Sequence, residues 1–174
     1  HRRGRRESAH RLKQKISAVM RYGIAHGLLQ SDPARDLRGA LAAPITANRA
    51  AVTDPKQVGE LMRAIHGYSG HRLTEIALKL APLLFVRPGN LRAMEWVELD
   101  LERAEWRIPG EKMKMRDPHV APLPKQALEL LREAHTLSGR GRFVFPSMRS
   151  GSRPMSNNTL NAALRRMGFD KHTM

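Results

Sequence analysis

Residues 83–91 read Leu-Leu-Phe-Val-Arg-Pro-Gly-Asn-Leu, and this stretch marks the point where one helix ends and another begins. Apolar residues recur at helical spacing from about Leu73 to Leu84, whereas Pro88 suits the first position of a new helical turn. Arg87 therefore stands between an apolar helix and a short helical turn. An arginine in that place either pairs with a buried acid or points at an anion from a rigid base. The turn at Pro88 and Gly89 has free amides that could help to hold a phosphate.

The residues that follow change from helical to mixed patterning. Residues 105–109 and 118–123 predict two short strands, with a turn rich in Lys and Met between them. Pro124 opens a predicted helix, and residues 143–146 predict a short buried extended segment. A last helix is predicted from Ser156, as its N-cap, to Gly168. The inward positions of the helix after Pro124 are Ala127, Leu128, Leu131 and Ala134.

The residues that precede the central stretch predict a separate helical segment. Apolar residues from Ser8 to Leu28 recur in steps of three and four, which predicts one amphipathic helix ending near Gly27. A further helical turn is expected at 34–41. The polar face of the long helix carries Arg11, Lys15, Arg21 and His26. Because such a helix cannot bury its apolar stripe alone, it is expected to belong to a larger helical domain.

Residues 43–52 have no periodicity and few large side chains, which is typical of an interdomain linker. A second domain is then expected to begin with Thr53 as an N-cap and Pro55 at the first helical position.

The net charge of the chain indicates what kind of molecule it binds. The chain of 174 residues carries 31 Lys and Arg against 16 Asp and Glu, a net charge of +15, which attracts phosphates. Residues 1–50 hold eleven basic and three acidic residues, or +8, and the remaining 124 residues hold twenty and thirteen, or +7. The opening run at residues 1–6 is either a basic arm that reaches DNA or a frayed end. Only 5% of residues are aromatic, which favours duplex over single-strand binding.

The residues that several common kinds of catalytic or binding site require are missing from the sequence. The chain has no cysteine, no phosphate-binding glycine loop, no zinc-type histidine pair and no acidic cluster suited to two Mg²⁺ ions. If the protein acts on a phosphodiester, it should therefore use fixed cations rather than a metal to stabilise the transition state, and no cofactor is expected.

An ordered set of motifs resembles the tyrosine recombinases, especially the integrases of prophages and integrative islands. The set begins with Val86-Arg87-Pro88-Gly89-Asn90-Leu91 and continues through Glu95-Trp96, Leu99-Asp100, Trp106-Arg107-Ile108-Pro109, Met113-Lys114-Met115, Pro118-His119, Pro122-Leu123, residues 143–147 and residues 155–168. Each motif alone is weak, but the preserved order and spacing make the set specific. Residues 1–42 resemble the end of the family's helical core-binding domain.

The resemblance implies roles for two cations. Arg87 falls on the first catalytic arginine, which binds the scissile phosphate. Lys114, eight residues before Pro122, falls on the lysine that protonates the departing 5′ hydroxyl. Lys112 is the fallback for that role, and the alternative is that both lysines only contact backbone phosphates. The expected DNA contacts are Arg11, Lys15, Arg21, Lys112, Arg116, His119, Asn157, Asn158 and Arg165, although His119 could simply be a strand residue.

Three departures from the family pattern are visible. Asn90 stands where the family usually has Glu or Asp. No His in the chain is followed by Arg at the third place, and neither Tyr22 nor Tyr68 matches the nucleophile position, so both are expected to be packing residues. The resemblance implies that the His-x-x-Arg motif and the nucleophilic tyrosine belong beyond Met174, and that residues 1–174 alone bind DNA without cleaving it.

The expected fold is mainly α with a small antiparallel sheet, an incomplete tyrosine-recombinase catalytic domain. The expected domains are 1–42, core-binding; 43–52, linker; and 53–174, catalytic. The resemblance implies prophage or island integration and excision, on double-stranded attachment sites, as a tetramer with accessory DNA-bending proteins, in the bacterial cytoplasm at the nucleoid and not at a membrane. The rival hypotheses are a non-enzymatic DNA-binding regulator or architectural protein, and an RNA-binding protein.

Overall fold

The computed structural model describes residues 6–37, 39–43 and 52–169, and the chain divides into two units, residues 1–48 and 49–174. Most of the expected linker and of the basic run at residues 1–6 lies outside the described residues. The two units are therefore described separately.

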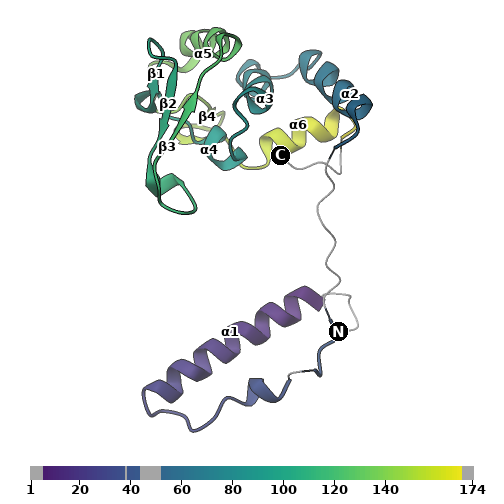
Figure 1. Ribbon diagram of the computed structural model, residues 1–174, viewed down its shortest axis with the longest axis vertical. Helices are drawn as coiled ribbons and strands as arrows, with labels where there is room; N and C mark the ends of the chain where they lie inside the picture. The colour runs from purple at the N-terminus through teal and green to yellow at the C-terminus, as the bar shows by residue number, and fades with distance from the viewer. Residues whose placement is uncertain (1–5, 38, 44–51, 170–174) are drawn as a thin grey trace. The chain divides into compact units, whose positions relative to one another are not determined.

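The first unit is built on one long helix. Helix α1 (Arg6–Ala25) is followed by the short 3₁₀ helix η1 (Pro33–Leu37) (Figure 1). Gly27 has a φ of +68°, a conformation that glycine adopts without strain, and it follows the end of α1 as the sequence predicts. The hydroxyl of Ser17 donates to the Asp32 carboxylate, which holds the returning chain against α1. The apolar stripe of α1 stays largely exposed, with Val19 at 67% and Leu12 at 59%.

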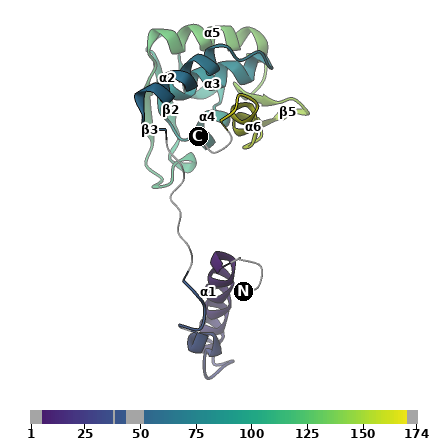
Figure 2. The same ribbon diagram turned by 90° about the vertical axis from the view of Figure 1, so that its right-hand side faces the viewer.

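Helix α3 (Arg72–Leu84) is the centre of the second unit. It packs against α2 (Pro55–His66), α4 (Pro88–Arg92), α5 (Lys125–Ser138) and α6 (Thr159–Arg166) (Figures 1 and 2). Its residues from Leu73 to Leu78 are all buried, including the polar Thr74 and Glu75, so this helix is enclosed on more than its apolar face. Pro88 begins α4 as predicted, directly after Arg87.

A three-stranded antiparallel sheet packs on this helical core. Its order is β1 (Leu99–Asp100), β2 (Glu105–Ile108) and β3 (His119–Pro122), and Ile108 pairs with His119 at the end of the hairpin next to its turn. Trp106, Ile108 and Ala121 are buried, whereas Arg107 and Val120 point to solvent, so only one face of the sheet meets the core. The two predicted strands are confirmed, and β1 adds a third. The fold is mainly α with a small antiparallel sheet, as expected.

A second, two-stranded sheet was not expected from the sequence. The buried segment that contains Val144 and Phe145 is confirmed, and it leads into a hairpin of β4 (Pro146–Ser147) and β5 (Ser150–Pro154). The strand β5 reads Ser-Gly-Ser-Arg-Pro and lacks the alternation of apolar residues by which a strand is predicted.

Two helix starts differ from the sequence prediction. Helix α2 is capped by Asp54, whose carboxylate accepts the Lys56 amide at 3.3 Å, and not by Thr53. Helix α6 begins at Thr159 with Asn158 as its N-cap, whereas the Ser156 hydroxyl accepts the Asn158 amide at 3.3 Å. Each start is thus shifted by one to two residues from the predicted cap.

Candidate active site and nucleic-acid interface

Arg87 stands between two helices and, in the part of the chain that the structure describes, has no acidic partner. Phe85 ends α3 in a left-handed conformation, with a φ of 51°, and Arg87 is extended at the N-cap of α4. The Arg87 side chain is exposed and makes no hydrogen bond or ion pair with any residue in the described ranges. The sequence left open whether Arg87 pairs with a buried acid or points at an anion. Its exposure and lack of a partner favour the second interpretation.

Lys114 lies on the turn between β2 and β3. It is exposed and, among the described residues, has no hydrogen-bond or ion-pair partner. The turn contains the 3₁₀ helix η3 (Gly110–Lys112) and closes where Arg116, at a φ of 61°, approaches Gly110. A Cβ atom on Gly110 would lie 2.1 Å from the Arg116 carbonyl oxygen, so the turn requires glycine there. Arg116 and His119 are both exposed at this end of the hairpin.

A direct contact joins the turn to the start of α4. The side-chain amide of Asn90, buried in the first turn of α4, donates to the sulfur of Met113 at 3.1 Å. Arg87 immediately precedes this helix and Lys114 immediately follows Met113, so the contact joins the two segments that carry the expected catalytic residues.

Lys112 occupies a different environment from Lys114. Its ammonium donates to the Ala93 carbonyl oxygen at 3.0 Å, to Glu95 Oε1 at 2.8 Å and to Glu98 Oε1. All three of its N–H donors therefore have protein acceptors. Lys112 is therefore engaged within the protein in this structure, which favours Lys114 over Lys112 as the general acid and sets Lys112 apart from the other expected DNA contacts.

The two carboxylates that hold Lys112 are themselves fixed by further donors. Arg142 donates from Nε and Nη2 to Glu95, at 2.8 and 3.0 Å. The fully buried indole of Trp106 donates to Glu98 Oε2 at 3.1 Å. The Arg142 guanidinium, and then the Lys112 ammonium, hold the pKa of Glu95 at about 2 against the opposing effect of burial. Glu95 is therefore ionised at neutral pH.

Sequence reasoning missed this network as a group. Its only sequence signal is a pair of acids, Glu95 and Glu98, around an apolar segment in a basic chain. Spacing alone does not show that a lysine 14 residues after Glu98 reaches it.

The expected contacts around α6 are exposed, with Asn157 and Asn158 at its start and Arg165 in its last turn. Asn157 and Asn158 are exposed, and Arg165 donates to Asn158 Oδ1 at 2.6 Å. Asn157 also lines a cavity of about 110 Å³ whose other walls include Pro88 and Gly89 of α4. The structure thus brings Asn157 beside α4, the helix whose N-cap is Arg87.

The expected contacts in the first unit are surface cations. Arg11, Lys15 and Arg21 are all exposed on α1. Arg11 forms an i,i+4 ion pair with Glu7, and Arg21 Nε donates to the Ser17 carbonyl oxygen at 3.3 Å. Such exposed pairs are weak, so a phosphate can replace the partner.

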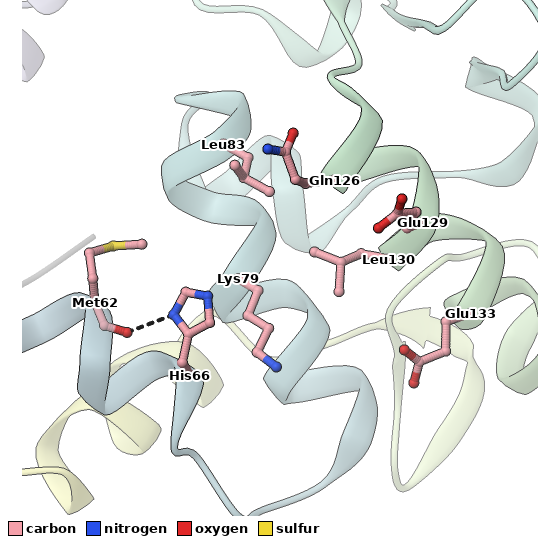
Figure 3. A pocket seen from close by; sticks show the side chains of 8 residues that line it. All are labelled: Met62, His66, Lys79, Leu83, Gln126, Glu129, Leu130 and Glu133. Carbon is pink, nitrogen blue, oxygen red and sulfur yellow. Dashed lines mark hydrogen bonds between the residues drawn. The ribbon is translucent and has the colours of Figure 1, made fainter.

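A larger groove between α2, α3 and α5 has a different character. It measures about 470 Å³, and its walls include Met62, Leu83 and Leu130 as well as the carboxylates of Glu129 and Glu133 (Figure 3). Lys79 and His66 also line it, so the groove carries both signs of charge, and neither Arg87 nor Lys114 lines it. We therefore place the candidate phosphate site at α4 and the β2–β3 turn.

Two family models match the chain. The phage integrase family matches residues 51–172, and the phage integrase central domain matches residues 1–40. The chain belongs to the phage integrase family. Within the described ranges, no helix combines the length and apolar character that crossing a bilayer requires.

Individual relatives give the same assignment. The chain is 35% identical to the integrase of Enterobacteria phage P4, over 98% of this chain and 41% of the relative, and 37% identical to the putative protein IntB of Escherichia coli (strain K12), over 96% and 45%. Its fold is similar to that of a lambda integrase dimer bound to a COC′ core site, with a TM-score of 0.66 and 19% identity over 99% of this chain and 48% of that one. The chain thus spans less than half the length of these relatives.

Proposed function

We propose that this chain is part of a site-specific DNA recombinase that integrates and excises a mobile element by cutting and rejoining duplex DNA. The observation that carries the proposal is the pair of exposed cations, Arg87 and Lys114, on two segments joined by the Asn90–Met113 contact. Neither cation has a partner among the described residues, so both are free to meet a phosphate. The lambda integrase of similar fold is bound to a DNA core site.

The proposed reaction is a transfer of the phosphodiester to a tyrosine supplied from outside residues 1–174. The tyrosine oxygen attacks phosphorus, the bond to the 5′ oxygen breaks, and a 3′-phosphotyrosyl link forms. Arg87 stabilises the charge on the non-bridging oxygens, and Lys114 gives its proton to the departing 5′ oxygen. The 5′ hydroxyl of a partner strand then reverses these steps, and the link conserves the bond energy, so no ATP is consumed.

Neither tyrosine of the chain suits the nucleophile. Tyr22 lies on α1 with its ring 4.1 Å from that of His26, and Tyr68 is partly buried against the core of the second unit. The partial burial of Tyr68 supports its expected packing role, whereas Tyr22 is 65% exposed and its expected packing role is not supported.

The remaining contacts set affinity. In this proposal Arg11, Lys15 and Arg21 clamp DNA phosphates from the first unit. Arg116, His119, Asn157, Asn158 and Arg165 contact DNA around the scissile phosphate. The whole protein acts as a tetramer on attachment sites in the bacterial cytoplasm, with accessory DNA-bending proteins.

A nicked suicide substrate tests the proposal, because it traps a covalent protein–DNA complex when the cut strand diffuses away. The full-length protein should form this complex on its attachment site, whereas residues 1–174 should shift the same DNA in a gel without forming it. A full-length protein that binds the site tightly but never becomes covalent would instead support a DNA-binding regulator.

A further inference from the structure

The two residues that immediately precede Lys114, in the turn between β2 and β3, are both bound to another segment of the protein. Met113 receives the amide of Asn90, and Lys112 binds Ala93, Glu95 and Glu98. Both ties end on the segment that runs from α4 to η2 (Trp96–Glu98), and that segment follows directly from Arg87. The position of Lys114 relative to Arg87 therefore depends on these contacts.

The acceptors of Lys112 are rigid. The side chains of Glu95 and Glu98 are 10% and 5% exposed, and Lys112 itself is 25% exposed. The two acids also form a capping box, in which the Glu98 carboxylate accepts the Glu95 amide at 3.2 Å. Arg142 and Trp106 take up the other carboxylate oxygens. If this lysine swung out to a phosphate, the buried Glu98 carboxylate would lose the cation that binds it, and Glu95 would keep only Arg142.

We propose that Lys112 is a positioning residue, whose ion pairs with Glu95 and Glu98 hold the β2–β3 turn so that Lys114 reaches the departing 5′ oxygen. This inference rests on the proposed function and deepens it. Lys112 does not touch DNA. It acts through the turn, and its replacement misplaces the general acid without removing it.

A substrate with a different leaving group can distinguish this positioning role from a general structural role. A DNA strand whose bridging 5′ oxygen is replaced by sulfur departs as a thiolate, which is stable without a proton, and so it does not need the general acid. Removal of Lys114, or its misplacement, should therefore slow cleavage of ordinary DNA and leave cleavage of the sulfur substrate almost intact. A variant that damages the fold should slow both.

The experiment uses the full-length protein and measures single-turnover covalent-complex formation on both substrates. Lys114→Ala is the reference for a missing general acid, and Lys125→Met, at an exposed position on α5, is the matched control. Lys112→Met should slow cleavage of ordinary DNA about 10- to 100-fold, as expected for a misplaced catalytic group, with less than about a threefold effect on the sulfur substrate. Lys112→Arg keeps the charge and should regain most of the rate.

A second variant tests whether an unpaired carboxylate, and not the lost position of Lys114, causes the slowing. Lys112→Met combined with Glu98→Gln removes the tie and one of the carboxylates that Lys112 neutralises. It should show the same selective slowing on ordinary DNA. Equal slowing of both substrates at unchanged DNA affinity, or no slowing of either, would overturn the positioning role. If the unaltered protein forms no covalent complex on either substrate, the proposed function itself fails, and this inference fails with it.

Discussion

The side-chain amide of Asn90 donates to the sulfur of Met113 at 3.1 Å. This contact joins α4, whose N-cap is Arg87, to the turn that carries Lys114. The resembling family usually has an acid at this position. A carboxylate could not donate this hydrogen bond, whereas the amide can. The uncharged residue thus has a defined local role.

Replacement of Asn90 by alanine should loosen the turn. The variant lacks the donor and leaves a small cavity, because Asn90 is buried, and the free energy of unfolding should fall by about 1–2 kcal/mol. Hydrogen exchange at the amides of residues 112–114 should become faster. Asn157→Ala, at an exposed position, is the control and should change neither quantity measurably. Unchanged exchange in Asn90→Ala would contradict the tie.

The ion pairs of Glu95 predict a specific dependence of stability on pH. Arg142 and Lys112 hold the folded-state pKa of Glu95 at about 2, below its ordinary value of 4.5. A lowered pKa contributes stability that is complete above the ordinary value and disappears as the pH falls towards 2. In urea titrations, the advantage of the unaltered protein over Glu95→Gln should be constant near pH 7 and shrink between about pH 4.5 and 2. An advantage that does not change over that window would count against these ion pairs.

Gly110 is required by the closed form of the turn. In Gly110→Ala the new methyl group would lie 2.1 Å from the Arg116 carbonyl oxygen, and backbone atoms cannot move aside cheaply. The turn should open, and the free energy of unfolding should fall by about 1–3 kcal/mol. Gly151→Ala, where no atom lies within 4 Å of the added carbon, is the matched control. Equal stability of the two variants would show that the turn is not closed at Gly110.

The cations of α1 should govern the salt dependence of DNA binding. Removing one cation that binds a phosphate reduces the slope of log affinity against log salt by about one. Lys15→Ala in residues 1–174 should therefore bind duplex DNA more weakly and with a shallower slope, as measured by fluorescence anisotropy. Lys56→Ala, which replaces an exposed lysine of α2 outside the expected interface, should keep the original slope. An unaltered slope in Lys15→Ala would remove α1 from the interface.

The sequence predicts the elements of this protein better than their contacts. Helical periodicity and Pro88 locate α3 and α4, and the strands around the turn follow from their short apolar runs. The hairpin of β4 and β5 was missed because Ser and Gly replace the usual alternation of strands. The partners of Lys112 could not be predicted for a different reason. Its partners precede it by 14 to 19 residues, and only the folded chain brings them within reach.

Arg87 tests the central claim most directly. The full-length protein should form a covalent complex with a suicide substrate, and Arg87→Ala should slow that step at least about 100-fold at unchanged DNA affinity, because the charge on the phosphate no longer meets a fixed cation. Arg132→Ala, which removes an exposed arginine of α5, is the matched control and should react at the original rate. A rate for Arg87→Ala equal to that of the control would contradict the assignment of the active site.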